Sequence, residues 1–371
     1  MQTERAPLIF LLPSLAGGGA ERVAATLAPR LDLHFDLTLA LLQNRCDFPL
    51  PGSVRKTFFS GPLLSAPANL VRFPYHVFSL VKLVRRSRAL TVLSFMEQAN
   101  IINVLAAQMT GHRAILSQRT NPKEQYLGKG VLGAAIVRSC ASLYPRCHRL
   151  IAVSHRVGEV VVEDYGLRPE QVAVIANPVD IEKMRAMAGE EPPLRLPARF
   201  LLHVGRLDIA TKRQDYLLSA FKEMLHEIAD LSLVFVGVGP DREFLQARCC
   251  ELGIAPKVIF AGWQENVAGF MSRALATVLC SRYEGWPNVL VEAMSVGCPV
   301  VATDCPTGPR EIIGNSRYGL LVGQDDPAEL VAACLSLFRE PTRMHLASQA
   351  ALRARDYALD TIVDRYRRVL Q

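Results

Sequence analysis

Residues 276–303 have the sequence ATVLCSRYEGWPNVLVEAMSVGCPVVAT, which predicts two strands with a helix between them. The apolar run Ala276–Cys280 lacks strict alternation, as expected for a strand that is covered on both faces. Pro287 suits the first turn of a helix, because its missing N–H would have no partner there. The apolar run Pro299–Ala302 predicts the second strand. Strand, helix and strand in this order indicate a parallel α/β sheet.

The same pattern extends over most of the chain. In the second half, further strands are expected at 200–204, 233–236, 258–261 and 320–322, with helices at 214–228 and from residue 241. In the first half, strands are expected at 8–12, 37–41, 91–94, 114–117 and 150–153, and helices from residue 20 and at 68–86, 99–109 and 155–165. The expected fold class is α/β, with two doubly wound Rossmann-like domains facing a central cleft. Ligands bind such sheets beyond the carboxyl ends of the strands.

The length of 371 residues, of which 50% are hydrophobic, suits two domains that each bury a full core. We expect an N-terminal domain over residues 1–183 and a C-terminal domain over 199–350. The segment Glu190-Glu191-Pro192-Pro193 predicts a hinge or linker at 184–198. Residues 351–371 are expected to form a C-terminal helical segment that packs back on the N-terminal domain.

Positive charge is concentrated in the first half. Residues 1–180 carry 20 Lys and Arg against 12 Asp and Glu, whereas the rest of the chain is nearly balanced. This excess indicates an anionic partner, such as a membrane surface, a phosphorylated lipid or nucleic acid. No aromatic-rich basic motif or zinc pattern supports nucleic acid. A merely solvated basic face is the alternative.

Two apolar helices in this half suit a membrane surface. The basic residues Lys82, Arg85, Arg86 and Arg88 end the first one, which could equally be a core helix with a solvated end. Residues 131–137 are too short to span a bilayer and predict a buried or interfacial helix. The N-terminal apolar stretch lacks a basic leader and is interpreted as a strand. The nine cysteines have no C-x-x-C spacing, so free thiols in a reducing cytosol are expected, without a metal site.

Two carboxylates bracket an expected anion site near residue 288. Glu284 lies in the loop before the helix and Glu292 lies more than a turn into it. The first N–H groups of the helix, near Asn288, Val289 and Leu290, would bind phosphate. Carboxylates beside a phosphate site suit a ligand rich in hydroxyl groups. The alternative is a capping Glu and a solvated one.

Further candidates follow the ends of other expected strands. Arg206 and Lys212 could hold a diphosphate, because Arg offers a planar fork and Lys a point charge. Gly18 and Gly19 permit close backbone approach before a helix, although the spacing is neither a P-loop nor a dinucleotide fingerprint. Arg119 could meet a phosphate or a sugar, and a structural arginine is the alternative.

Taken together, these motifs resemble the retaining family-4 glycosyltransferases of GT-B fold, over nearly the whole chain. The resemblance rests on the glycine turn, on Asn177-Pro178-Val179-Asp180, on His203-Val204-Gly205-Arg206 and above all on the E-x7-E motif from Glu284 to Glu292. The segment 304–312 is similar to a branch that includes bacterial enzymes adding N-acetylgalactosamine or related sugars to polyprenyl-diphosphate-linked saccharides.

The resemblance implies a role for each motif residue. Arg206 and Lys212 would hold the donor diphosphate, Glu292 the ribose, and Glu284 the donor-sugar hydroxyls. The donor would be a nucleotide sugar, most simply a UDP-sugar, used without a metal or other cofactor. The acceptor would be a lipid-diphosphate-linked saccharide at the cytoplasmic face of a membrane, in cell-surface glycan or glycoprotein synthesis. The alternatives are a transferase with a soluble acceptor and a non-enzymatic protein that binds an anionic ligand.

Overall fold

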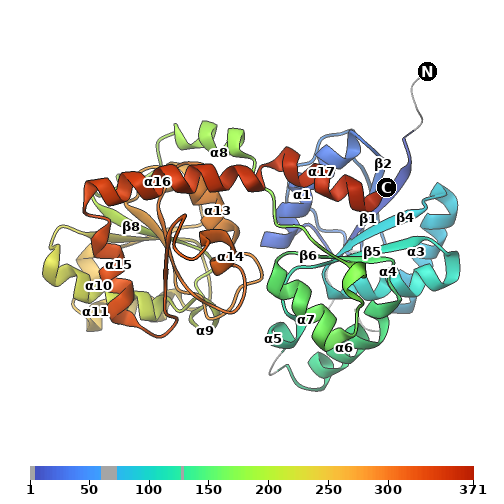
Figure 1. The fold of residues 1–371 in the computed structure, drawn as a ribbon, viewed down its shortest axis with the longest axis horizontal. Coiled ribbons are helices and arrows are strands. Elements are labelled where there is room, and N and C mark those ends of the chain that lie inside the picture. The colour runs from blue at the N-terminus through green and yellow to red at the C-terminus, as the bar shows by residue number, and fades with distance from the viewer. Residues whose placement is uncertain (1–4, 60–72, 127–128) are drawn as a thin grey trace. The chain divides into compact units, whose positions relative to one another are not determined.

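The chain forms two parallel β-sheets, one in each of two units, in the computed structural model, which describes residues 5–59, 73–126 and 129–371. Unit 1 comprises Met1–Pro178 and Leu359–Gln371, and unit 2 comprises Val179–Ala358. The chain therefore enters unit 2 after Pro178 and leaves it after Ala358, so that unit 2 is inserted into unit 1. Figure 1 shows both units, with labels on most helices and on some of the strands.

Unit 1 contains a seven-stranded sheet in the order β3-β2-β1-β4-β5-β6-β7, with all neighbours parallel. Its strands are β1 (Pro7–Leu12), β2 (Asp36–Leu41), β3 (Arg55–Phe58), β4 (Thr91–Phe95), β5 (Arg113–Gln118), β6 (Arg149–Ala152) and β7 (Val172–Val174). Ile9, Leu11 and Val92 are fully buried in its core. Continuous burial along the central strands explains why the sequence shows apolar runs there rather than alternation.

Unit 2 contains a six-stranded parallel sheet in the order β10-β9-β8-β11-β12-β13. Its strands are β8 (Phe200–Val204), β9 (Ser232–Val236), β10 (Val258–Gly262), β11 (Ala276–Leu279), β12 (Val300–Thr303) and β13 (Leu320–Val322). Both sheets reverse their strand order once, at β1/β4 in unit 1 and at β8/β11 in unit 2. The expected α/β class with two doubly wound, Rossmann-like sheets is confirmed.

Helices connect the parallel strands, as this topology requires. Unit 1 has α1 (Gly19–Asp32), α3 (Phe73–Ser87), α4 (Glu97–Thr110), α5 (Pro122–Tyr126), α6 (Gly130–Leu143), α7 (His155–Tyr165) and α17 (Leu359–Leu370). Unit 2 has α8 (Ile181–Ala188), α9 (Ile209–Lys212), α10 (Gln214–Glu227), α11 (Arg242–Glu251), α12 (Ala268–Met271), α13 (Asn288–Ser295), α14 (Pro309–Ile313), α15 (Pro327–Ser336) and α16 (Glu340–Ala354). In unit 1, α4 packs against α3 and α6, while α1 packs against α17.

The expected segment boundaries differ from the structure in several places. Helix α8 occupies the start of the expected hinge at 184–198 and is held by unit 2, where Asn266 Nδ2 donates to the carbonyl of Met187 (2.7 Å). The expected helical segment 351–371 comprises the end of α16, a 3-10 turn at Arg355–Tyr357 and all of α17, and of these only α17 belongs to unit 1. The start of the helix expected at 68–86 lies outside the described residues.

The cysteines are all free thiols, and all are buried except Cys46 and Cys250. The short apolar run at 131–137 belongs to the longer helix α6, in which only Gly133 and Cys140 are buried. Within the described ranges, no helix is both long and apolar enough to cross a membrane.

Candidate functional site

The predicted residues of unit 2 gather where its strand order reverses. Strands β8 and β11 are neighbours, and the chain leaves them toward opposite edges of the sheet. Their following loops therefore diverge at the carboxyl edge, which is where such sheets bind ligands. The loop after β8 carries Arg206 and leads to Lys212, and the loop after β11 carries Glu284.

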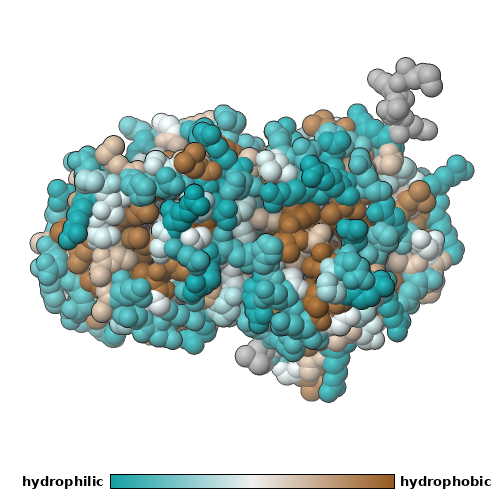
Figure 2. Space-filling model, viewed as in Figure 1, coloured by the Kyte–Doolittle hydropathy of each residue, from teal (hydrophilic) through white to brown (hydrophobic). Residues whose placement is uncertain are grey.

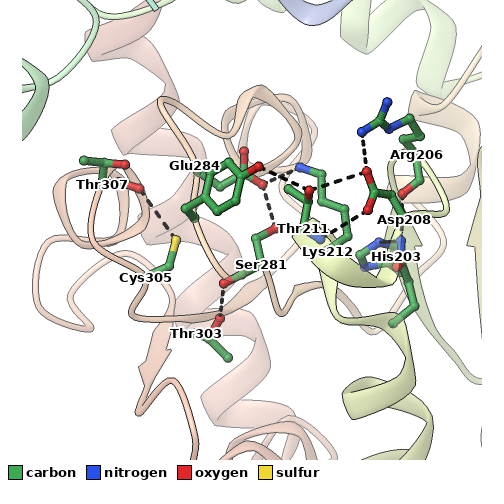
Figure 3. Close-up of polar contacts among 12 residues, drawn as sticks. His203, Arg206, Asp208, Thr211, Lys212, Ser281, Glu284, Thr303, Cys305 and Thr307 are labelled. Carbon is green, nitrogen blue, oxygen red and sulfur yellow. Dashed lines mark hydrogen bonds and ion pairs between the residues drawn. The ribbon is translucent and has the colours of Figure 1, made fainter. Parts of the chain in front are cut away.

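Lys212 and Glu284 form an ion pair at this reversal point. Lys212 Nζ donates to Glu284 Oε1, and the same oxygen accepts a hydrogen bond from Ser281 Oγ (2.6 Å). Figure 3 shows the two side chains pointing toward each other, Lys212 from the end of α9 and Glu284 from its loop. Their side chains are only 21% and 12% exposed, so solvent screens the pair weakly. The site thus holds a cation and a carboxylate within one hydrogen bond of each other.

Arg206 is held in place by Asp208, a residue that the sequence analysis missed. Arg206 Nη2 donates to Asp208 Oδ2, and the Arg206 side chain is 68% exposed. Asp208 also caps α9, because its Oδ1 accepts the backbone N–H of Thr211 (3.2 Å). The same carboxylate therefore orients a guanidinium and begins the short helix that ends at Lys212 (Figure 3).

The loop that carries Arg206 is fastened to the turn after β9. Gly205 N donates to the carbonyl of Val236 (3.0 Å), and Leu207 N donates to that of Val238 (3.1 Å). A β-carbon at Gly237 would lie 2.0 Å from the carbonyl oxygen of Gly205. One at Gly239 would lie 2.1 Å from that of Leu207. Both positions therefore require glycine, and the resemblance of this turn to a dinucleotide motif has a packing explanation.

Buried polar groups support the loop from below. Gln214 Nε2 donates to the Arg206 carbonyl (2.7 Å) and lies 3.3 Å from His203 Nε2. Burial lowers the pKa of His203 to about 4, so its ring is neutral at pH 7. With one proton on the ring, Nδ1 donates to the carbonyl of Val278 (3.0 Å) and Nε2 accepts from Gln214. His203 thus links the two central strands to the Arg206 loop.

The loop that carries Glu284 ends where helix α13 begins. The first residue of the helix is Asn288, one later than expected, because Pro287 occupies the capping position. Asn288 and Val289 are half-buried and Leu290 is buried. Glu292 lies in the second turn and is half-buried. The positive end of the helix dipole therefore faces the same edge of the sheet as Lys212.

Gly18 and Gly19 lie in unit 1, at the start of α1. Gly17 has a φ of 68°, Gly18 is the capping residue and Gly19 is the first residue of the helix. A β-carbon at Gly18 would lie 2.1 Å from Glu21 Oε2, so the Glu21 carboxylate folds against the turn. Burial raises the pKa of Glu21. In this structure a side-chain carboxylate thus occupies the start of α1, where a phosphate was expected.

Arg119 also lies in unit 1, where it is only 8% exposed. Its guanidinium donates to Ser117 Oγ (3.1 Å), to Tyr366 Oη (3.3 Å) and to Asn177 Oδ1. It also lies 4.6 Å from the centre of the Phe95 ring. These contacts join strand β5, the last residues before unit 2 and helix α17, which is the pattern of an anchoring arginine.

A second polar cluster lies at the reversal point of unit 1, between β1 and β4. Met96 precedes α4 with a φ of 74°, a conformation that a residue other than glycine rarely adopts. Glu97 is 3% exposed and accepts a hydrogen bond from Gln118 Nε2 (2.8 Å). Burial raises the pKa of Glu97. The sequence contained no signal for this cluster, because nothing in the residues around Met96 predicts the strained turn.

Two family models match the chain, one for each half. Residues 17–183 match "Glycosyltransferase Family 4", and residues 198–340 match "Glycosyl transferases group 1".

Within the described residues, no group of three or more His, Cys, Asp or Glu could hold a metal ion.

Proteins from Campylobacter jejuni are similar over almost the full length. An N-acetylgalactosamine-N,N'-diacetylbacillosaminyl-diphospho-undecaprenol 4-alpha-N-acetylgalactosaminyltransferase is 29% identical over 94% of each chain. A second C. jejuni protein is 26% identical over 97% of each chain. It is named as an alpha-1,4-N-acetyl-D-galactosaminyltransferase for a saccharide linked to diphospho-undecaprenol.

Solved structures share the fold at lower identity. Anabaena HepE in complex with UDP superposes with a TM-score of 0.78 at 18% identity, over 98% of this chain and 99% of that one. Sucrose-phosphate synthase from Thermosynechococcus elongatus superposes with a TM-score of 0.82 at 16% identity, over 98% of both chains.

Proposed function

Because this chain belongs to the family-4 glycosyltransferases of GT-B fold, we propose that it moves a sugar from a UDP-sugar to a lipid-linked saccharide with retention of anomeric configuration. The transferred sugar is an N-acetylhexosamine or a hexose. The ion pair between Lys212 and Glu284 carries this proposal, since it sets a phosphate-binding cation beside a hydroxyl-binding carboxylate.

When the donor binds, the two residues of this ion pair separate and contact different parts of the nucleotide sugar. The diphosphate binds Lys212, which offers a point charge, and Arg206, which offers a planar fork. Glu284, released from Lys212 but still held by Ser281, accepts hydrogen bonds from the sugar hydroxyls. The ribose binds Glu292, and the backbone at Asn288–Leu290 supports the phosphate and the sugar.

The residues of unit 2 stabilise the leaving group. As the bond between the anomeric carbon and the phosphate oxygen breaks, negative charge grows on the diphosphate. Fixed cations and N–H dipoles that bind this charge more tightly than the ground state lower the barrier. The acceptor hydroxyl attacks on the same face, and its proton passes to the released phosphate oxygen. No metal or other cofactor takes part in this scheme.

The acceptor is a saccharide on a polyprenyl diphosphate. The two C. jejuni relatives act on acceptors of this kind by name, and both align over nearly the full chain. Such an acceptor places the enzyme at the cytoplasmic face of a membrane, as a peripheral protein in the synthesis of cell-surface glycans. The excess positive charge of residues 1–180 is consistent with this location.

Thermal stabilisation by nucleotides tests the donor assignment first. UDP, GDP, ADP and NAD are compared without metal, and a ligand at about 100 times its dissociation constant adds about 2.7 kcal/mol to the unfolding free energy. We expect a shift with UDP that K212A abolishes and R156A retains, because Arg156 lies on α7 of unit 1, where it pairs with Glu159 and Glu163. A shift with GDP or ADP alone would transfer the proposal to another donor, and no shift would refute it.

A further inference from the structure

Helix α3 presents an unusual face to solvent. Tyr75 and Phe78 are 55% and 61% exposed near its start, and Lys82, Arg85 and Arg86 are exposed near its end. Steps of three or four residues place these side chains along one side of the helix. The opposite side contributes Val77, Leu80, Val81 and Val84 to the core of unit 1. The solvent side is therefore aromatic at one end and cationic at the other.

The aromatic end borders an apolar groove between α3 and α4, which pack together (Figure 1). The groove has a volume of about 350 Å³ and is lined by Phe73, Pro74, Val77, Phe78, Leu105, Gln108 and Met109. Gln108 is the single polar residue of this lining, and Met109 is 45% exposed. Gathered apolar side chains on a surface indicate a contact with another molecule or with a membrane.

The cationic end of α3 has no acidic partner on its own helix, unlike three arginines on other helices. On helices α7, α11 and α17, Arg156, Arg248 and Arg367 each contact an acid three positions away. Helix α3 contains no Asp or Glu. Within the described part of the chain, none of its three exposed cations forms an ion pair, nor does Arg88 beyond it. Their positive charge is therefore available to an anionic partner.

We propose that this face of α3 is the surface on which the enzyme docks on an anionic lipid bilayer. Aromatic side chains favour the boundary between headgroups and acyl chains, and Lys and Arg bind the lipid phosphates. An apolar groove together with cations that form no ion pair among the described residues, all on one helix, fits a bilayer better than an acidic protein, which would not need the aromatic end. This inference rests on the proposed function, because a lipid-linked acceptor requires access to a membrane.

Helix α6 provides a comparison within the same unit. Val131 and Leu132 are 89% and 48% exposed at its start. Figure 2 shows hydrophobic side chains where α6 lies in Figure 1. Arg138 is the single cation between its first and last residues, Gly130 and Leu143. A purely hydrophobic docking mode would therefore use α6 as well, whereas the proposed mode requires the cations of α3.

Vesicle sedimentation with the full chain tests the proposal. Vesicles of phosphatidylcholine alone are compared with vesicles that also contain phosphatidylglycerol, at low and high salt. The wild type is expected to bind the anionic vesicles at low salt and to release them at high salt. Each cation contributes about fivefold in affinity, so K82Q/R85Q/R86Q should bind about 100-fold more weakly. Y75S/F78S should also bind more weakly, and the control L132S should bind as the wild type does.

Three results would overturn the proposal: no binding of the wild type to anionic vesicles, unchanged binding of the triple variant, or a loss with L132S that equals the loss with Y75S/F78S. The UDP-induced rise in melting temperature is measured for every variant, and it tests the donor residues proposed in unit 2. Vesicle binding by a wild type that no nucleotide stabilises would refute the proposed function but not the docking surface. A UDP effect without vesicle binding would refute the docking surface but not the proposed function.

Discussion

Replacing Gly239 by alanine tests whether the turn after β9 positions Arg206. The new β-carbon would lie 2.1 Å from the carbonyl oxygen of Leu207 and 2.6 Å from its carbonyl carbon and amide nitrogen. Close carbon–oxygen contacts in proteins are about 3.3 Å, so the loop must move by about 1 Å. Both sides of this contact are backbone, so no flexible side chain can give way. The displaced segment includes Arg206, the neighbour of Leu207.

A displacement of this size has a predictable kinetic effect. Misplacing a catalytic group by about 1 Å can cost about 100-fold in rate, which corresponds to about 2.7 kcal/mol. Crowding a packed region lowers the unfolding free energy by about 1–3 kcal/mol, which a two-unit chain of this size should survive. We therefore expect G239A to be folded, with kcat/KM for the donor reduced about 100-fold.

UDP release from the nucleotide sugar is the assay, with the melting temperature as the measure of folding. G189A is the control, because its β-carbon would meet only the carbonyl of Ala186 at 3.5 Å. Activity of G239A within about twofold of the wild type would refute the reasoning, since the two loops would then not be mechanically coupled. A loss of activity in G189A of the same size would show that the effect is not specific to the turn.

The other predictions concern single side chains. K212A should lower kcat about 100- to 1,000-fold in the same assay, as expected for a lost charge-stabilising group; unchanged kcat would exclude Lys212 from the reaction. The pKa of His203 is lowered to about 4 by burial, so the unfolded chain binds a proton that the folded chain excludes below pH 6.5. The contribution of His203 to the unfolding free energy should thus fall by about 1.4 kcal/mol for each pH unit between about 6.5 and 4, and H203Q should show a smaller slope in urea titrations. R119M should lower the melting temperature while leaving KM for the donor unchanged, because Arg119 joins Asn177 to Tyr366; a raised KM with an unchanged melting temperature would favour the donor contact instead.

The central strands of both sheets were predictable because each is a mainly apolar run between glycines or polar loops. The edge strand β3 was not, because its sequence Arg-Lys-Thr-Phe is polar and only its pairing with β2 makes it extended. Strand β7 has three residues, which is too short for a pattern. Helix α6 could be expected from its apolar residues, but a sequence cannot show that most of them face solvent.

The site was partly predictable for a related reason. Residues that follow parallel strands meet at one edge, so Arg206, Lys212 and Glu284 could be grouped without knowing any distance. Asp208 carried a usable signal, since an Asp before a short helix is a capping residue. The need for glycine at 239 had no local signal, because the clash arises with a backbone segment some thirty positions earlier in the chain.

The insertion of unit 2 into unit 1 determines the order in which the protein can be completed during synthesis. Helix α17 covers unit 1 with the apolar side chains of Ile362, Val363 and Tyr366, and it packs against α1. These residues leave the ribosome only after all of Val179–Ala358. At about 5–20 residues per second, that delay is roughly 10 to 40 seconds. Throughout this interval the nascent unit 1 exposes the surface that α17 will cover, and unit 2, although translated later, can fold first.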